Sequence, residues 1–196
     1  MKKVLASLFA ICLFSQFTFA QNKNIRPQAI GVSFILNDFN TASRIRTGSV
    51  EQVIREKSWA KFKEMSPGLA VTYFKGLHPN IDFAGTLGAS FVNYPVPNKP
   101  ASSGENLLLE ADASLNLKMF PDNYWVSPYL IAGIGASKYK GYYGAIIPLG
   151  AGLKVNFFDE FSLFTTAQYR VGVTKETTNY HFLYSFGVAG ILNAGK

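Results

Sequence analysis

The chain has almost no cysteine, and this absence limits its chemistry. Cys12 is the single cysteine among 196 residues, and it lies in a segment that we expect to be removed. A mature chain without cysteine forms neither disulfides nor thiolate metal sites, so hydrogen bonds and packing must hold the fold. Its two histidines, His78 and His181, are far apart and show no metal-binding spacing with acidic residues, so we expect no metal and no cofactor.

Long apolar runs are also absent. A membrane-spanning helix needs about twenty consecutive apolar residues, and no segment of the chain has them. Mean hydropathy is nevertheless slightly positive. A chain with this profile can cross a membrane only as a closed β-barrel, because every backbone polar group in lipid must be paired.

The N-terminus has the pattern of an export signal. A basic start precedes a short apolar run over residues 4–14, and small residues end at Ala20. This pattern predicts a cleaved secretory signal peptide over residues 1–20 and a single barrel domain over residues 21–196. Cys12 leaves a lipoprotein as a disfavoured alternative.

The chain carries a net charge of +7, yet it has no basic helix and no basic-aromatic motif. The cations are scattered, so we expect no nucleic-acid partner. For an exported barrel, outer-membrane lipid and the phosphates of lipopolysaccharide are the more natural anionic neighbours.

A period-two rhythm dominates the rest of the sequence, most sharply over residues 107–119. One parity is apolar: Leu107, Leu109, Ala111, Ala113, Leu115, Leu117 and Met119. The other parity is mostly polar: Leu108, Glu110, Asp112, Ser114, Asn116 and Lys118. A strand places the two parities on opposite faces, as a strand between lipid and a polar lumen requires.

About eight such segments follow one another, the smallest number usual for a bacterial outer-membrane barrel. They cover residues 29–37, 68–75, 81–91, 105–119, 128–137, 147–157 and 161–172, and a last strand runs through Phe182 to Leu192. The predicted fold is all-β: a closed antiparallel up-and-down transmembrane β-barrel of about eight strands.

The links between the segments predict the orientation. Links after the even strands are short, whereas residues 38–67 and 94–104 form long polar links. Residues 138–144 and 173–179 make shorter links on the same side. Such barrels have short periplasmic turns and longer outer loops, so the long links face outside and the location is the cell outer membrane.

Aromatic residues predict two interfacial girdles. The inner set is Phe120, Tyr124, Trp125, Phe157, Phe158 and Phe161, and the outer set is Tyr94, Tyr139, Tyr142, Tyr143, Tyr180 and Phe182. The alternative is the aromatic core of a soluble sandwich.

Charged and polar residues on the lumen parity are the first candidate site: Asp82, Glu110, Asp112, Lys118, Lys154, Gln168 and Arg170. They could form an ion path, but the interior of a barrel this small is just filled by side chains. We therefore favour a plug of mutually paired groups, in which Lys154 or Arg170 pairs with Glu110 or Asp112.

The first long link is the second candidate site. Ser49 followed by Gln52 predicts a capped helical turn or two. The link is basic, with Arg44, Arg46, Arg55, Lys57, Lys61 and Lys63. Two interpretations stay open: contact with lipopolysaccharide or another outside partner, or a solvated lid packed on the barrel mouth.

Catalysis finds little support in the sequence. His181 and Ser185 share a parity, but residues four apart on a strand lie roughly 13 Å apart, beyond hydrogen-bond reach. We expect a structural or surface-interaction role without catalysis. The alternatives are a surface adhesin or ligand-binding barrel acting through the first two outer loops and, less favoured, a lipid-modifying outer-membrane enzyme.

Several stretches together resemble a known family: residues 59–70, 108–116 and 127–130, Gly133 and Gly135, and residues 143–145 and 168–170. They are similar to the OmpA-type outer-membrane barrels of Bacteroidetes-like bacteria. We expect the barrel-assembly machinery as a partner of such a barrel, and an unknown surface or periplasmic partner stays open. A peptidoglycan-binding domain commonly follows that barrel, and this sequence has none after it, so we expect the barrel domain only.

Overall fold

The computed structural model describes residues 25–97, 104, 106–157 and 161–192. The predicted signal peptide with Cys12, the turn at residues 158–160, the tip of the second outer link and residues 193–196 lie outside the described residues. Within the described part of the chain, no helix is long and apolar enough to cross a membrane.

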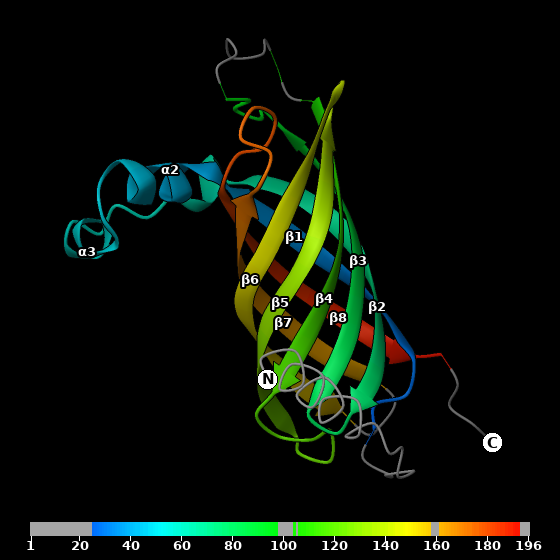
Figure 1. Cartoon of the computed structure of the whole chain (residues 1–196). Coiled ribbons are helices and arrows are strands. Elements are labelled where there is room, and N and C mark those ends of the chain that lie inside the picture. The colour runs from blue at the N-terminus through cyan, green and yellow to red at the C-terminus, as the bar shows by residue number, and fades with distance from the viewer. Residues whose placement is uncertain (1–24, 98–103, 105, 158–160, 193–196) are drawn as a thin grey trace, which may run out of the picture.

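Eight strands form one closed antiparallel barrel (Figure 1). They are β1 (Ala29–Asp38), β2 (Ser66–His78), β3 (Ile81–Val92), β4 (Asn106–Lys118), β5 (Val126–Tyr139), β6 (Tyr142–Phe157), β7 (Phe161–Gly172) and β8 (His181–Ile191). Each strand pairs with its neighbour in sequence, and β1 closes the barrel by pairing with β8. The predicted fold class is confirmed, and all eight predicted strands are present.

The predicted alternation of faces is also present. Inward residues of β4 such as Ser114 and Asn116 are buried, whereas outward Leu115 and Leu117 are exposed. The outer surface carries large apolar side chains on every side, with exposed fractions of 62% at Leu87 and 72% at Ile134. This surface is apolar where a soluble protein would be polar.

Inward glycines make room in this narrow interior. The Tyr129 ring lies where a Cβ on Gly152 would be, and a Cβ on Gly133 would collide with the Ala113 carbonyl of the next strand. A glycine at position 133, where a narrow barrel is expected to need room or a bend, permits the close approach of β4.

The predicted length of one outer link is wrong. Strands β5 and β6 continue to Tyr139 and Tyr142, which pair directly, so the link predicted at residues 138–144 is a two-residue turn at Lys140 and Gly141. Lys140 has φ of 53°, the left-handed conformation that such tight hairpin turns use. We call the end of the barrel that carries this turn and the first link the loop end, and the opposite end the short-turn end.

The first link contains helices α2 (Phe39–Thr47) and α3 (Val50–Arg55) and the 3-10 helix η1 (Phe62–Glu64). Ser49 caps α3 by accepting the Gln52 N–H at 3.1 Å, as predicted. Helix α2 is unpredicted, and Asp38 caps it by accepting the Thr41 N–H at 2.8 Å.

The inner aromatic girdle forms as predicted over its described members, with Trp125 close to Phe157 and Phe157 stacked on Phe161 at 5.3 Å. Its sixth predicted member, Phe158, lies outside the described residues. The outer girdle is partly wrong, because Tyr94 and Tyr139 are buried inside the barrel mouth and not on its outer surface. On the outside, the girdle is built by a cluster on β7 and β8 and the link between them: Tyr169, Tyr180, Phe182 and Tyr184.

Candidate functional site

All seven residues of the predicted lumen set are buried inside the barrel. They do not form one network. Glu110, Asp112 and Arg170 lie near the loop end, whereas Asp82, Lys118 and Lys154 lie near the short-turn end. Gln168 lines a small cavity between the two groups.

The loop-end cluster comprises Glu110, Asp112, Arg170 and His181. The Arg170 guanidinium lies 2.9 Å from Glu110 Oε2 and 2.8 Å from Asp112 Oδ2. His181 Nε2 lies 3.4 Å from the other Glu110 oxygen, and its side chain is fully buried. Because β4 and β7 are not neighbours in the sheet, these contacts cross the lumen and connect opposite walls.

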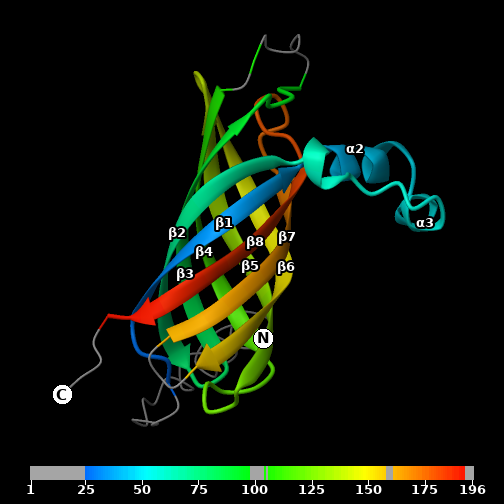
Figure 2. The ribbon, with the colours of Figure 1, turned by 180° about the vertical axis from the view of Figure 1, so that it is seen from behind.

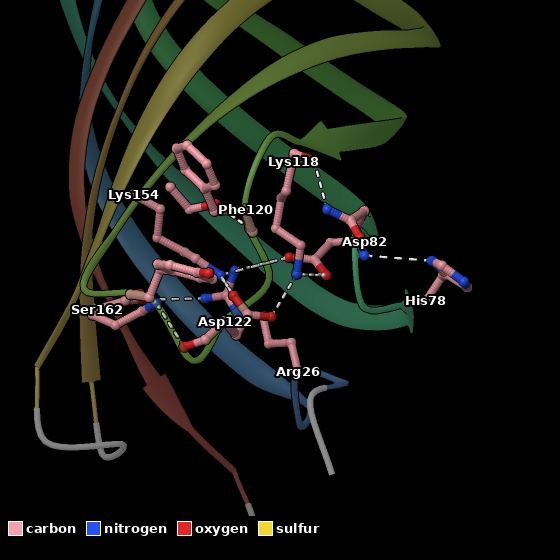
Figure 3. Close-up of polar contacts among 12 residues, drawn as sticks. Arg26, His78, Asp82, Lys118, Phe120, Asp122, Lys154 and Ser162 are labelled. Atoms are coloured by element: carbon pink, nitrogen blue, oxygen red, sulfur yellow. Dashed lines mark hydrogen bonds and ion pairs between the residues drawn. The ribbon is translucent and has the colours of Figure 1, made fainter. Parts of the chain in front are cut away.

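The short-turn cluster comprises Arg26, Asp82, Lys118, Asp122 and Lys154 (Figure 3). Lys118 Nζ lies 2.7 Å from Asp82 and 2.5 Å from Asp122. Lys154 bonds to Asp122 and lies 3.8 Å from Asp82. Of the two expected cations, Arg170 does pair with Glu110 and Asp112. The pairing of Lys154 with either carboxylate is wrong, because Lys154 lies at the opposite end of the barrel from both.

Arg26 is a member of this cluster that the sequence does not reveal. It precedes β1 and enters the short-turn end, where Nη2 donates to Ser162 Oγ at 3.1 Å and Nη1 lies 3.7 Å from Asp82. Its guanidinium also lies 4.3 Å from the centre of the Phe74 ring. Burial lowers the pKa of Arg26, and the nearby Asp82 carboxylate opposes this shift.

Aromatic rings close the loop end of the barrel above the loop-end cluster. Phe39, at the start of α2, packs 5.1 Å from Tyr94 and 4.6 Å from His181, and Tyr94 packs 5.2 Å from Tyr139. The Tyr94 hydroxyl accepts the Asn179 N–H at 2.5 Å, which ties the second link to the link before β8. Burial raises the pKa of Tyr94.

Little open space remains between the two clusters. Two cavities inside the barrel measure about 30 and 10 Å³, which is room for a few water molecules. A larger recess of about 470 Å³ opens at the short-turn end and is lined by Arg26, Lys154, Asn156, Phe161, Ser162 and Ile191, among others. The described residues contain no group of side chains that could hold a metal ion.

Apart from Phe39 at its start, the first link does not form a lid over the mouth. Helices α2 and α3 project sideways from the loop end, as both opposite views of the ribbon show (Figures 1 and 2). Arg44 contacts Glu64 at 3.6 Å and the Ser58 carbonyl within the link. Arg46 fixes α2 to the barrel, since it donates to Asn179 at 3.2 Å and lies 4.2 Å above the Tyr180 ring.

The remaining basic residues of the predicted loop set, Arg55, Lys57, Lys61 and Lys63, are exposed on this projection. Their cations form no ion pair with any residue of the described chain. In the predicted set, Arg44 and Arg46 therefore hold the link in place, and the other four residues are free cations.

Among the residues that the structure describes, no serine-histidine pair assembles at the rim. The Ser185 hydroxyl lies 2.6 Å from that of Thr166, whereas His181 contacts Glu110 and packs against the Phe39 ring. Each of the two side chains is engaged elsewhere.

No protein-family model and no curated protein matches the sequence. Solved structures do resemble it. Neisserial surface protein A gives a TM-score of 0.55 at 13% identity, over 83% of this chain and 96% of that one. The N-terminal β-barrel domain of Pseudomonas aeruginosa OprF gives a TM-score of 0.50 at 14% identity, over the same shares. At this low identity the similarity establishes the fold, and this chain is an eight-stranded closed barrel of the architecture that bacterial outer-membrane proteins use.

Proposed function

We propose that this chain is an outer-membrane barrel with a structural or surface-interaction role, whose interior is closed to ions and which carries out no catalysis. The observation that carries the proposal is the combination of an apolar outer wall with an interior occupied by paired charges. A soluble barrel would need the reverse arrangement.

The outer wall supports the membrane location. Large apolar side chains such as Val32, Leu69 and Phe186 lie exposed around the barrel, and aromatic clusters lie near each end. Outer-membrane barrels have an apolar band about 25 Å tall between two aromatic girdles. The Lys2 and Lys3 start and the apolar run after it supply the route of export.

The interior supports a closed lumen. Arg170 connects β7 to β4 across the loop end, and Lys118 and Lys154 connect β4 and β6 to Asp82 and Asp122 at the other end. An ion passing through would have to break these contacts and leave buried charges unpaired, which costs several kcal/mol.

The proposal includes how the chain is processed, how it is inserted and what surrounds it. The barrel-assembly machinery would insert the domain over residues 21–196 after removal of residues 1–20, and outer-membrane lipid with its lipopolysaccharide would surround it. Its residues resemble OmpA-type barrels of Bacteroidetes-like bacteria. The absence of an assembled nucleophile and base among the described residues favours a role without catalysis over lipid modification.

Two measurements test the proposal. The mature protein should fractionate with outer membranes and migrate faster in detergent gels before boiling than after it, because a closed barrel resists unfolding without heat. In planar bilayers it should give no steady conductance, with a general porin reconstituted in the same way as the positive control. Recovery as a detergent-independent soluble monomer contradicts the location, and stable large channels contradict the closed lumen.

A second candidate function is a surface adhesin or ligand-binding barrel that acts through the first two outer links. Exposed Trp59 and Phe62 on the first link favour it, because solvated loops seldom display such rings without a contact surface. Binding of a purified surface partner that is lost on deletion of residues 49–63 would support this function.

A further inference from the structure

The far part of the first link is both apolar and basic at its surface. We call residues 50–63 the distal arm. Four large apolar side chains are exposed there: Val50, Ile54, Trp59 and Phe62, with Phe62 exposed by 69%. The four free cations Arg55, Lys57, Lys61 and Lys63 alternate with them along the chain. Apolar and aromatic side chains combined with lysine and arginine are the composition of segments that lie in a membrane surface.

The distal arm is a folded unit and not a loose loop. Val53 and Ala60 are buried against the rest of the link, and the Ala60 N–H donates to the Thr41 hydroxyl on α2 at 2.9 Å. These buried residues already form the small core of the arm. The exposed apolar side chains are therefore not needed for its fold and are available for contact with something outside the chain.

The root of the link fixes the height of the arm. Arg46 lies over the ring of Tyr180, and Tyr180 belongs with Tyr169, Phe182 and Tyr184 to the outer aromatic cluster of β7 and β8. Tyrosine and tryptophan rings gather at the level of the lipid headgroups. Helix α2 thus leaves the barrel at the membrane interface.

The direction of the arm brings it to the lipid. It projects away from the barrel axis, and α3 lies closer than α2 to the short-turn end in both views (Figures 1 and 2). An arm that starts at headgroup height, points outward and then descends reaches the outer leaflet beside the barrel.

We propose that the distal arm lies in the surface of the outer leaflet, with its apolar side chains immersed among the lipids and its cations against lipid phosphate groups. This inference rests on the proposed outer-membrane location. The arm carries Arg55, Lys57, Lys61 and Lys63 against Glu51 and Glu56, so an anionic lipid surface complements its charge. The protein would then contact the bilayer at a second place, beside the barrel wall.

Tryptophan fluorescence tests the position of the arm directly. Trp59 and Trp125 are the two tryptophans of the chain, and Trp125 lies in the inner girdle at the opposite end. The Trp125→Phe variant isolates Trp59, and the Trp59→Phe variant isolates Trp125. Each variant is reconstituted in bilayers of phosphatidylcholine and phosphatidylglycerol, with lipids brominated near the headgroup as membrane quenchers and acrylamide as the aqueous quencher.

The expected result is that brominated lipid quenches Trp59 as strongly as Trp125, and that acrylamide reaches Trp59 several-fold less than free tryptophan. A second result would overturn this inference but not the outer-membrane location. In it, brominated lipid quenches Trp125 while acrylamide reaches Trp59 freely. The barrel is then inserted and the arm stands in water, as a protein-binding arm would. If brominated lipid quenches neither tryptophan, the proposed location fails as well.

Charge variants test the phosphate contact. We expect brominated lipid to quench Trp59 more strongly in bilayers that contain phosphatidylglycerol than in pure phosphatidylcholine. A triple variant in which Lys57, Lys61 and Lys63 are each replaced by glutamine should lose most of this difference. The matched control replaces Lys138, Lys140 and Lys175 with glutamine, which removes the same charge from exposed positions at the same end of the barrel. Equal effects of the two triple variants would overturn the phosphate contact.

Discussion

Arg170 offers the sharpest test of the paired interior. The Arg170→Met variant keeps an apolar stem of similar length and removes the cation that lies 2.9 Å from Glu110 and 2.8 Å from Asp112. At an effective dielectric constant of about 20, each of these contacts is worth roughly 6 kcal/mol before desolvation is subtracted. Removing one partner of a buried pair costs a net amount of about 3–5 kcal/mol, because the remaining charge stays buried. We expect a loss of that size.

Urea unfolding of the protein in lipid vesicles, followed by tryptophan fluorescence, measures this loss. The Arg170→Met, Glu110→Gln, Asp112→Asn triple variant removes the unpaired carboxylates as well and should recover most of the free energy of unfolding. Lys175→Met, at an exposed position, should change it by less than about 0.5 kcal/mol. The reasoning is refuted if Arg170→Met costs under about 1 kcal/mol, or if the triple variant is no more stable than the single one.

Three further predictions concern the barrel wall. Leu115→Arg puts a charge in the apolar band and should cost about 2–4 kcal/mol in vesicle unfolding experiments. Single cysteines along residues 107–119 of a mature chain should report lipid and lumen alternately in spin-label accessibility, and an inverted alternation would show that the register is wrong. Gly152→Leu should lower the free energy of unfolding by about 1–3 kcal/mol, because its side chain overlaps the Tyr129 ring, whereas Gly190→Leu, with open space around it, should be neutral.

The strands could be predicted because period-two alternation is a local property. Each inward or outward assignment along β4, from Leu107 to Lys118, depends only on the neighbouring residues, and the structure keeps that alternation. The same local information predicts the Ser49 cap of α3. Local information places the ends of the β5–β6 turn less well. The turn depends on Lys140 in the left-handed conformation, and a lysine gives no clear signal for that conformation in the sequence.

Contacts across the lumen could be predicted only in part. The expected pairing of Arg170 with Glu110 or Asp112 is present, whereas Lys154 pairs with Asp122. Lys154 and Glu110 share the inward face, but their heights along the barrel depend on the tilt and stagger of strands, which no short window encodes. The outer girdle is partly wrong for a different reason. Tyrosine suits both a girdle and the lining of a barrel mouth, and the inward parity of Tyr139 on β5 places it in the mouth. Arg26 was missed because it precedes the first strand and reaches its partner Ser162 from a distant part of the chain.

The seam between β1 and β8 has a kinetic consequence. The other seven ladders join strands that follow one another in sequence, so each can form before the whole chain is in place. The seam pairs Ala29 with Ile191 and Asp38 with Phe182, and it must wait until nearly the whole barrel sequence has been ordered. Such distant contacts slow folding, and both open edges can pair with other chains until they meet. We therefore expect that closing the seam is the late, rate-limiting event of folding, and that its speed decides between insertion and aggregation.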